Sequence, residues 1–166
     1  QVSRAEYADR IVRGGFPEAI ARSSPRRRER FHDSYVADLV ARDVMQLSDI
    51  ERTAQMRALI RLLAARSGQL LVASSVGNQA GVSQATALRY IGLLEEVFLI
   101  KRVPAWSRNI SSRVGRASKV AFVDSGIAAN LLGADARSLI RPGGPFGPLL
   151  EGFVVMELAR QATWSQ

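Results

Sequence analysis

The stretch AGVSQATALRYIGLLEEVFLI, residues 80–100, combines a turn, an amphipathic helix and an abrupt change to strand-forming residues. Gly81 can end a short preceding helix, and the Ser83 hydroxyl can cap the next one by accepting a backbone hydrogen bond. Four apolar residues recur near one side of this second helix and are predicted to face the core: Ala87, Leu88, Ile91 and Leu94. The spacing from Val76 through Gly81 to Ser83 therefore predicts a helix-turn-helix.

The outer side of the second helix is predicted to carry small, polar and basic side chains: Gln84, Ala85, Thr86, Arg89 and Tyr90. In the major groove of DNA, Arg can pair with guanine and Gln with adenine, and the small Ala85 permits close approach. A helix that only packs would more often expose Glu and Lys. We therefore predict that Gln84, Thr86, Arg89 and Tyr90 contact DNA.

Two strand-like segments follow, FLIKRVP at residues 98–104 and SKVAFVD at residues 118–124, and they predict a two-stranded wing. Its tip, residues 105–117, is rich in Arg, Ser and Asn and contains Trp106. From Lys101 to Lys119 there are six basic residues and no acidic one, a density typical of surfaces that meet phosphates. We predict DNA contacts from Lys101, Arg108, Arg113 and Arg116. A solvated loop is the alternative.

Further helices are predicted before this region. Residues 3–13 form a helix capped by Ser3 and ended by Gly14, and residues 23–47 form one of about six turns with Pro25 at its first position. Residues 48–67 form a third helix that stops at Gly68. Residues 70–72 then form a short strand or an extended segment.

After the wing, Asp124 or Ser125 is predicted to cap a short helix that Gly133 closes. Residues 141–148, RPGGPFGP, predict a flexible joint. Residues 149–161 then form a helix that carries Glu151 and Glu157, and its packing partner is expected to lie partly outside this sequence. Either glutamate could be an ordinary surface residue.

The composition excludes several classes of protein. The 166 residues contain no cysteine and one histidine, His32, so we expect neither disulfides nor a metal site, with His32 on the surface or in packing. No apolar run approaches the ~18 residues of a membrane-spanning helix, which predicts a soluble, cytoplasmic chain without membrane contact. The sequence begins without Met or a secretory signal and is therefore interpreted as an excised fragment.

Several stretches in the same order resemble a family of bacterial and archaeal AAA-type ATPases, in the domain of unknown function after the nucleotide-binding module. They are GGFPEAI, YVADLVARDV, LLAARSGQLL, GVSQATALRYIGLLEEVFLIKRVPAWSRN, KVAFVDSGIAANLLG and LLEGFVVMELAR. The resemblance implies that residues 1–22 end the ATPase lid and that residues 23–135 form a helical and winged-helix domain. Residues 136–166 would be a linker and the first helix of a restriction-nuclease-like module.

The implied fold class is mainly α with a small β wing: a helical bundle, a winged helix-turn-helix and the start of the nuclease-like module. Neither GxxxxGK[ST] nor a Walker B strand occurs, so no catalytic residue or cofactor is assigned, and ATP and Mg²⁺ are expected only in the parent protein. Glu151 or Glu157 would match one acidic residue of a nuclease site.

The function expected from the sequence is therefore binding of double-stranded DNA by part of a larger ATPase, without catalysis in this chain. An interaction module that docks the parent ATPase module or another subunit is the alternative, and an apolar patch with Trp106 and Tyr90 would favour it. A third hypothesis is that the chain contains the remnant of a nuclease-like domain. An oligomer is possible under each.

Overall fold

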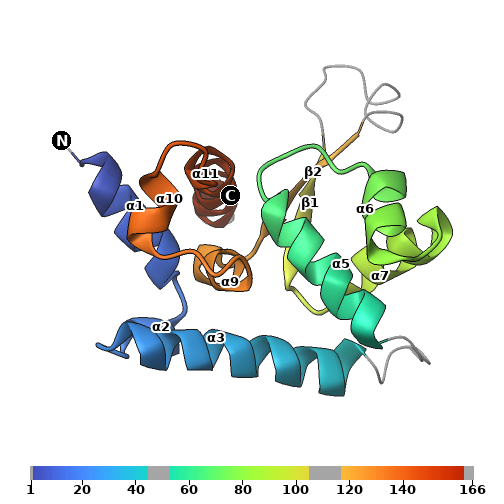
Figure 1. Cartoon of the computed structure of the whole chain (residues 1–166), viewed down its shortest axis with the longest axis horizontal. Helices are drawn as coiled ribbons and strands as arrows, with labels where there is room; N and C mark the ends of the chain where they lie inside the picture. Colours follow the sequence, from blue (N-terminus) through green and yellow to red (C-terminus); the bar gives the residue numbers. More distant parts are fainter. Residues whose placement is uncertain (1, 45–52, 105–116, 163–166) are drawn as a thin grey trace.

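The computed structural model describes residues 2–44, 53–104 and 117–162, which form a mainly helical protein with one small antiparallel sheet, as predicted. Figure 1 shows two groups of elements side by side, with the long helix α3 (Pro25–Leu39) running beneath both. The helical group contains α1 (Arg4–Arg13), α2 (Pro17–Ile20), α3, the π-helix η1 (Val40–Val44), α9 (Ser125–Leu131), α10 (Ala136–Ile140) and α11 (Phe146–Ala162). The sheet group contains α5 (Thr53–Ala65), α6 (Ala73–Ala80), α7 (Gln84–Glu96), β1 (Ile100–Val103) and β2 (Lys119–Phe122).

The helix boundaries follow local capping chemistry. The Ser3 hydroxyl accepts a hydrogen bond from the Glu6 N–H at 3.2 Å while the Glu6 carboxylate accepts one from the Ser3 N–H at 2.6 Å, which closes the predicted first turn of α1. Pro25 begins α3 as predicted, but Ser24 makes no side-chain capping bond. Proline has no backbone N–H group, so the first turn of α3 has one fewer hydrogen-bond donor that needs a capping acceptor.

The sheet group starts from the predicted pair of helices. Gly81 ends α6 with φ +73°, in the left-handed region that favours glycine, and Ser83 caps α7 by accepting a hydrogen bond from the Thr86 N–H at 3.1 Å. β1 and β2 then pair antiparallel, with Ile100 opposite Phe122. Two helices joined by a turn at Gly81 and a pair of strands are therefore present where the sequence predicts them.

A third extended segment pairs with β2 from the other side. The Leu71 N–H donates to the Ser118 carbonyl at 2.8 Å, the Val120 N–H donates to the Gln69 carbonyl at 3.1 Å, and Leu70 bridges Lys119. The prediction of a strand or extended segment at residues 70–72 is thus met by a short bridge at Leu70. These bonds connect the end of α5 to the sheet.

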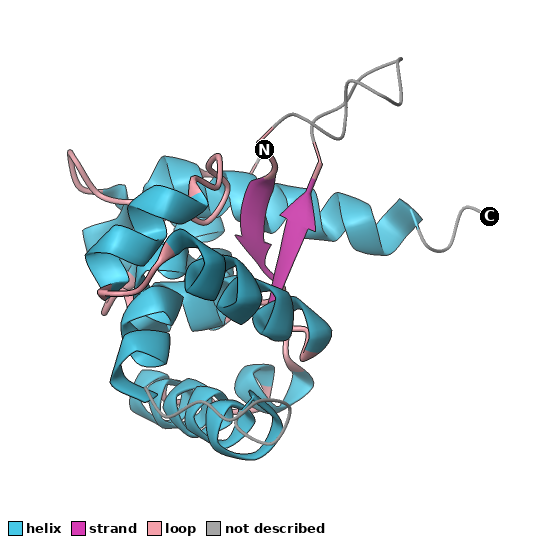
Figure 2. Ribbon diagram, turned by 90° about the vertical axis from the view of Figure 1, so that its right-hand side faces the viewer, coloured by secondary structure: helices cyan, strands magenta, loops and turns pink. Residues whose placement is uncertain are grey.

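The C-terminal helix differs from its prediction. α11 begins at Phe146, inside the predicted flexible joint, and it packs against β2, α1 and α9. In Figure 2 this helix crosses behind the two strands. Phe146, Leu149 and Met156 form the buried side of α11. At least some of the elements that this helix packs against therefore lie within this sequence. The short helix α10 was not predicted.

Asp124 connects segments that lie far apart in the sequence. It is 1% exposed, and its Oδ1 accepts a hydrogen bond from the Ile127 N–H at 3.1 Å, which caps α9 as predicted. Its Oδ2 accepts further bonds from the N–H groups of Gly15 at 2.6 Å and Phe16 at 3.2 Å. One carboxylate therefore holds the turn between α1 and α2 against the start of α9.

Glycine is required where this turn meets Asp124. Gly14 has φ +72°, and a Cβ added there would lie 2.3 Å from Oδ1 of Asp124. Both the backbone conformation and the close approach exclude other residues. The predicted role of Gly14 as a helix stop is therefore only part of its role.

None of the helices in the described part of the chain combines the length and the apolar composition that a bilayer crossing requires.

We predict that Asp124→Ala lowers the free energy of unfolding by about 3–5 kcal/mol, because three backbone N–H groups lose their acceptor in a region shielded from water. Asp135→Ala is the matched control: Asp135 also caps a helix, accepting from the Ser138 N–H at 2.6 Å, but it is exposed. Its loss should cost much less, because water can replace the lost acceptor at an exposed helix cap. Urea unfolding followed by circular dichroism measures both, and equal losses would contradict the connecting role of Asp124.

Candidate functional site

The outer side of α7 is formed by Gln84, Ala85, Leu88 and Arg89, which are all exposed. Gln84 and Ala85 lie in the first turn, and Arg89 lies about one turn further along. The placement of Gln84, Ala85 and Arg89 agrees with the prediction. Together they present an amide, a small side chain and a guanidinium on one end of the helix.

The prediction for Tyr90 was wrong. Tyr90 was predicted to project outward, but it is 3% exposed, whereas Leu88, predicted to face the core, is 43% exposed. Successive residues of a helix are rotated by about 100°, so an inward side centred on Ala87, Ile91 and Leu94 includes the residue at 90 before the one at 88. Tyr90 therefore packs in the core, with the Arg89 guanidinium carbon 5.8 Å from its ring centroid.

Thr86 belongs to the helix cap. Its side chain is half-buried, its N–H donates to Oγ of Ser83, and the two hydroxyl oxygens lie 2.9 Å apart. The hydroxyl that was predicted to contact DNA is therefore already engaged within the first turn. Its methyl group remains the part available for an outside contact.

The basic residues of the strands differ in their surroundings. Lys101 on β1 is exposed and makes no ion pair with any residue that the structure describes. Its neighbour Arg102 pairs with Glu95 of α7, Nε to Oε2 at 2.5 Å, and the Arg102 N–H donates to Oε1 of Glu95 at 2.9 Å. Of the predicted wing residues, Arg108, Arg113 and Arg116 lie outside the described residues, as does Trp106.

Positive charge is concentrated in the sheet group and its connections. Residues 53–123 contain ten basic and two acidic side chains, a net +8 that equals the net charge of the whole chain. The remaining residues are therefore neutral in sum. A polyanion would be attracted to this region rather than to the helical group.

The two glutamates of α11 pair within the chain. Glu151 forms an ion pair with Lys119 of β2, and Glu157 forms one with Arg160. No cluster of three His, Cys, Asp or Glu residues within the described ranges could hold a metal ion. The two ion pairs support the interpretation that both glutamates are ordinary surface residues.

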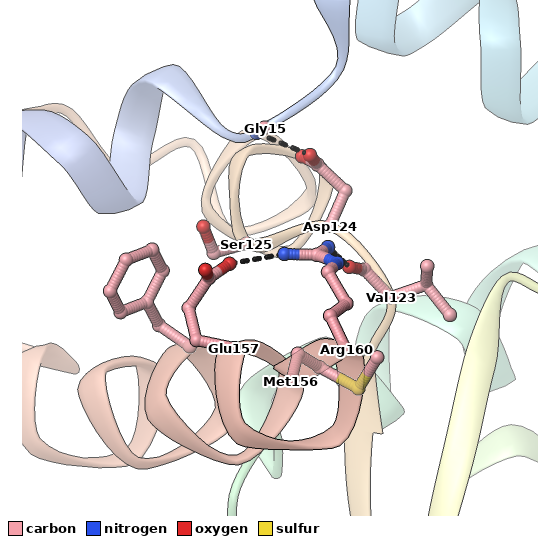
Figure 3. A pocket seen from close by; sticks show the side chains of 8 residues that line it. Gly15, Val123, Asp124, Ser125, Met156, Glu157 and Arg160 are labelled. Carbon is pink, nitrogen blue, oxygen red and sulfur yellow. Dashed lines mark hydrogen bonds and ion pairs between the residues drawn. The ribbon is translucent and has the colours of Figure 1, made fainter. Parts of the chain in front are cut away.

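A small cavity of about 20 Å³ lies next to Asp124, between the ends of β2 and α11 (Figure 3). Arg160 reaches across it and donates through Nη2 to the Val123 carbonyl oxygen at 2.6 Å. A volume of this size has room for about one water molecule. The arrangement of Asp124 and Arg160 therefore joins α11 to the start of α9 and leaves no space for a substrate.

His32 is buried in the helical group. It is 2% exposed, and its Nε2 has no hydrogen-bond partner among the described residues. A Cβ added at Gly126 would lie 2.8 Å from Cε1 of His32, so the glycine makes room for the ring. Burial lowers the pKa of His32, and this outweighs the attraction of Asp124 and Asp33 for the protonated ring. The sequence suggested packing as one role of this residue, but it gave no sign of its unpartnered nitrogen.

We predict that the free energy of unfolding falls as the pH is lowered from 7.5 to 5.5. Because the folded-state pKa of His32 lies below the unfolded value, protonation favours the unfolded chain, with a slope of at most about 1.4 kcal/mol per pH unit. Urea titrations across this range measure the slope. His32→Gln removes the only imidazole and should flatten it, so a slope that persists in the variant would contradict this origin.

Comparison with known proteins identifies relatives but no activity. The family described as "Domain of unknown function (DUF8612)" matches residues 4–138. The uncharacterised proteins Rv2008c of Mycobacterium tuberculosis and Mb2031c of Mycobacterium bovis are each 32% identical over 153 residues, 92% of this chain and 35% of theirs. An uncharacterised protein of Haemophilus influenzae is 24% identical over 160 residues, 93% of this chain and 38% of its own.

The chain thus spans little more than a third of the length of these curated relatives. No solved structure matches it. The matches support the part of the resemblance that concerns a domain of unknown function, and none of them names an ATPase or a winged helix. By the extent of the family match, the chain belongs to the DUF8612 family of domains.

Proposed function

We propose that this chain binds double-stranded DNA as a winged helix-turn-helix, with α7 as the recognition helix. The order of elements supports the proposal: α5, the extended segment 68–71, the pair α6 and α7, and then β1 and β2, with β2 paired on both sides. In a helix-turn-helix the second helix enters the major groove and its N-terminal residues face the base edges. α7 is that second helix.

The single observation that carries the proposal is the exposure of Gln84 and Arg89 on α7 within the region that holds the entire net charge. Gln suits adenine and Arg suits guanine, while Ala85 and the exposed Leu88 can contact thymine methyl groups. Phosphate contacts would come from Lys101 and, by the sequence, from Arg108, Arg113 and Arg116. With four to six phosphates neutralised, the logarithm of the binding constant should fall with the logarithm of salt concentration at a slope of about −4 to −5.

The resemblance to AAA-type ATPases extends this proposal to the parent protein. The matched region leaves almost two thirds of the mycobacterial relatives uncovered, which gives room for a nucleotide-binding module. In such a protein, ATP and Mg²⁺ would bind outside these 166 residues, and the nucleotide state would alter how α7 contacts DNA.

A protein-docking role is the second candidate, and Phe98 favours it. Phe98 is 77% exposed and has φ +55°. The Phe98 N–H donates to the Glu95 carbonyl at 3.0 Å and the Leu99 N–H to the Leu94 carbonyl at 2.9 Å, the bonds of a helix end where glycine is usual. An aromatic residue costs about 1 kcal/mol or more in this conformation, and the ring gains little burial in return. A contact with a partner protein would explain its presence.

Arg89→Ala is predicted to weaken binding to a preferred duplex, selected from a random library, by about 1–3 kcal/mol and to weaken random duplex less. Arg30→Ala removes the same charge from an exposed position on α3 and should leave both affinities nearly unchanged. Fluorescence anisotropy at fixed salt compares the four cases. If Arg89→Ala has no more effect than Arg30→Ala, α7 is not the recognition helix.

A second prediction compares two adjacent basic residues of β1. Arg102 is paired with Glu95, whereas Lys101 makes no ion pair with any described residue. Lys101→Ala should weaken all duplexes about equally and reduce the magnitude of the salt slope by about 1. Arg102→Ala should change the slope much less, since its charge is already paired. Slopes measured between 50 and 200 mM NaCl test this, and equal changes in the two variants would rule out the proposed difference.

A further inference from the structure

A groove of about 730 Å³ lies in the helical group, on a different group of elements from α7. Its walls come from α1, the first half of α3, α9 and the start of α10. The volume lies within the range of small-molecule sites, about 300–1,000 Å³. DNA binding by α7 does not use this groove.

The groove is lined by more acidic than basic side chains. Its side chains include four carboxylates, from Asp9, Glu29, Asp33 and Asp135, and two guanidinium groups, from Arg28 and Arg137. A net charge of −2 therefore lines a groove in a protein whose net charge is +8. This contrast favours a cationic ligand.

Several of these groups are already occupied within the protein. Asp33 accepts a hydrogen bond from the Asn130 side-chain amide at 2.7 Å, and Asp135 caps α10. Arg28 donates to the backbone carbonyl of Arg22 at 2.9 Å. These contacts shape the walls and leave other groups for a ligand.

Asp9 on α1 and Glu29 on α3 remain available. Neither side chain makes a hydrogen bond or ion pair with any residue in the described ranges. A carboxylate is an acceptor only, so each can take a hydrogen bond from a charged donor. The two carboxylates come from different walls, which suits a ligand with more than one donor group.

His32 also lines the groove, and its ring is almost completely enclosed there. Its Nε2 is a buried polar atom without a hydrogen-bond partner among the described residues. Such atoms are rare in folded proteins, so this wall of the groove has one polar group still unsatisfied. Burial keeps the pKa of His32 low, so near neutral pH the ring is uncharged. An uncharged ring does not repel a cation bound in the groove.

We propose that this groove binds a small organic cation with two or more ammonium groups, of the polyamine class, through Asp9 and Glu29 with His32 beside it. An ammonium group is cationic, donates three hydrogen bonds and accepts none, which matches two carboxylates without a partner in the described ranges. A bare metal ion fits less well, because no set of three ligating residues is assembled in the described part of the chain. The lysine side chains of a peptide would supply the same chemistry, and the test separates the two sources.

The test uses the whole 166-residue chain with spermidine as the probe, at constant ionic strength and pH 7.5. Because His32 is the only histidine, its Cε1–H signal in an NMR spectrum reports on the groove without ambiguity. We expect a saturable shift of this signal with spermidine. The double variant Asp9→Asn, Glu29→Gln should lose at least tenfold in spermidine affinity.

The matched control is Asp38→Asn, Glu96→Gln, which removes two exposed carboxylates outside the groove and should bind spermidine as the parent chain does. An equal loss in both double variants, or an equal shift with MgCl₂ at matched ionic strength, would reduce the effect to general charge attraction and overturn the site. Absence of a saturable shift would overturn it as well. An acetylated Lys-Ala-Lys peptide amide that binds more tightly than spermidine would support ammonium recognition and assign its source to a protein segment.

Urea midpoints guard against misfolding of the double variant. If the double variant is unstable, Asp9→Asn alone should still weaken spermidine binding, and unchanged binding by a folded Asp9→Asn protein would count against the site. The proposal does not rest on DNA binding, so failure in this test leaves the role of α7 intact.

Discussion

The carboxylate of Asp124 is the constraint on which the arrangement of the helical group depends. It accepts hydrogen bonds from Gly15 and Phe16, which precede it by 109 and 108 residues, and from Ile127, which begins α9. A buried carboxylate is costly unless it is well hydrogen-bonded, so no position of the α1–α2 turn that breaks these bonds is favourable. Since Asp124 follows β2 almost directly, the same bonds also fix where the sheet group joins the helices.

This junction separates two chemical surfaces. The residues that precede Asp124 from α5 onward hold the whole net charge, and the helical group around His32 contains the acidic groove. Long-range attraction would therefore direct a polyanion to α7 and a small cation to the groove. Arg160 strengthens the junction by donating to Val123, so α11 is tied to the point where the two groups meet.

The parts of this arrangement that could be predicted from the sequence are those governed by short spacings. Ser83, Gly81 and Asp124 were identified as caps or stops because capping bonds reach only a few residues. The phase of α7 was misjudged at Leu88 and Tyr90, since both are large and apolar in part and only the surrounding core decides which is buried. The hydrogen bonds from Gly15 and Phe16 to Asp124 join residues more than 100 positions apart, so no short sequence pattern predicts them. The groove could not be predicted either, because its walls come from helices that only the fold brings together.

α7 offers different chemistry at its two ends. Gln84 and Ala85 lie in its first turn, whereas Phe98 follows its last residue, and 13 helical residues span about 20 Å. An aromatic side chain in a left-handed conformation at the far end adds nothing to base recognition, and glycine would end the helix at lower cost. Contacts with a protein at Phe98 would therefore leave the proposed base-reading residues free, so the two candidate functions of this helix do not compete for the same side chains.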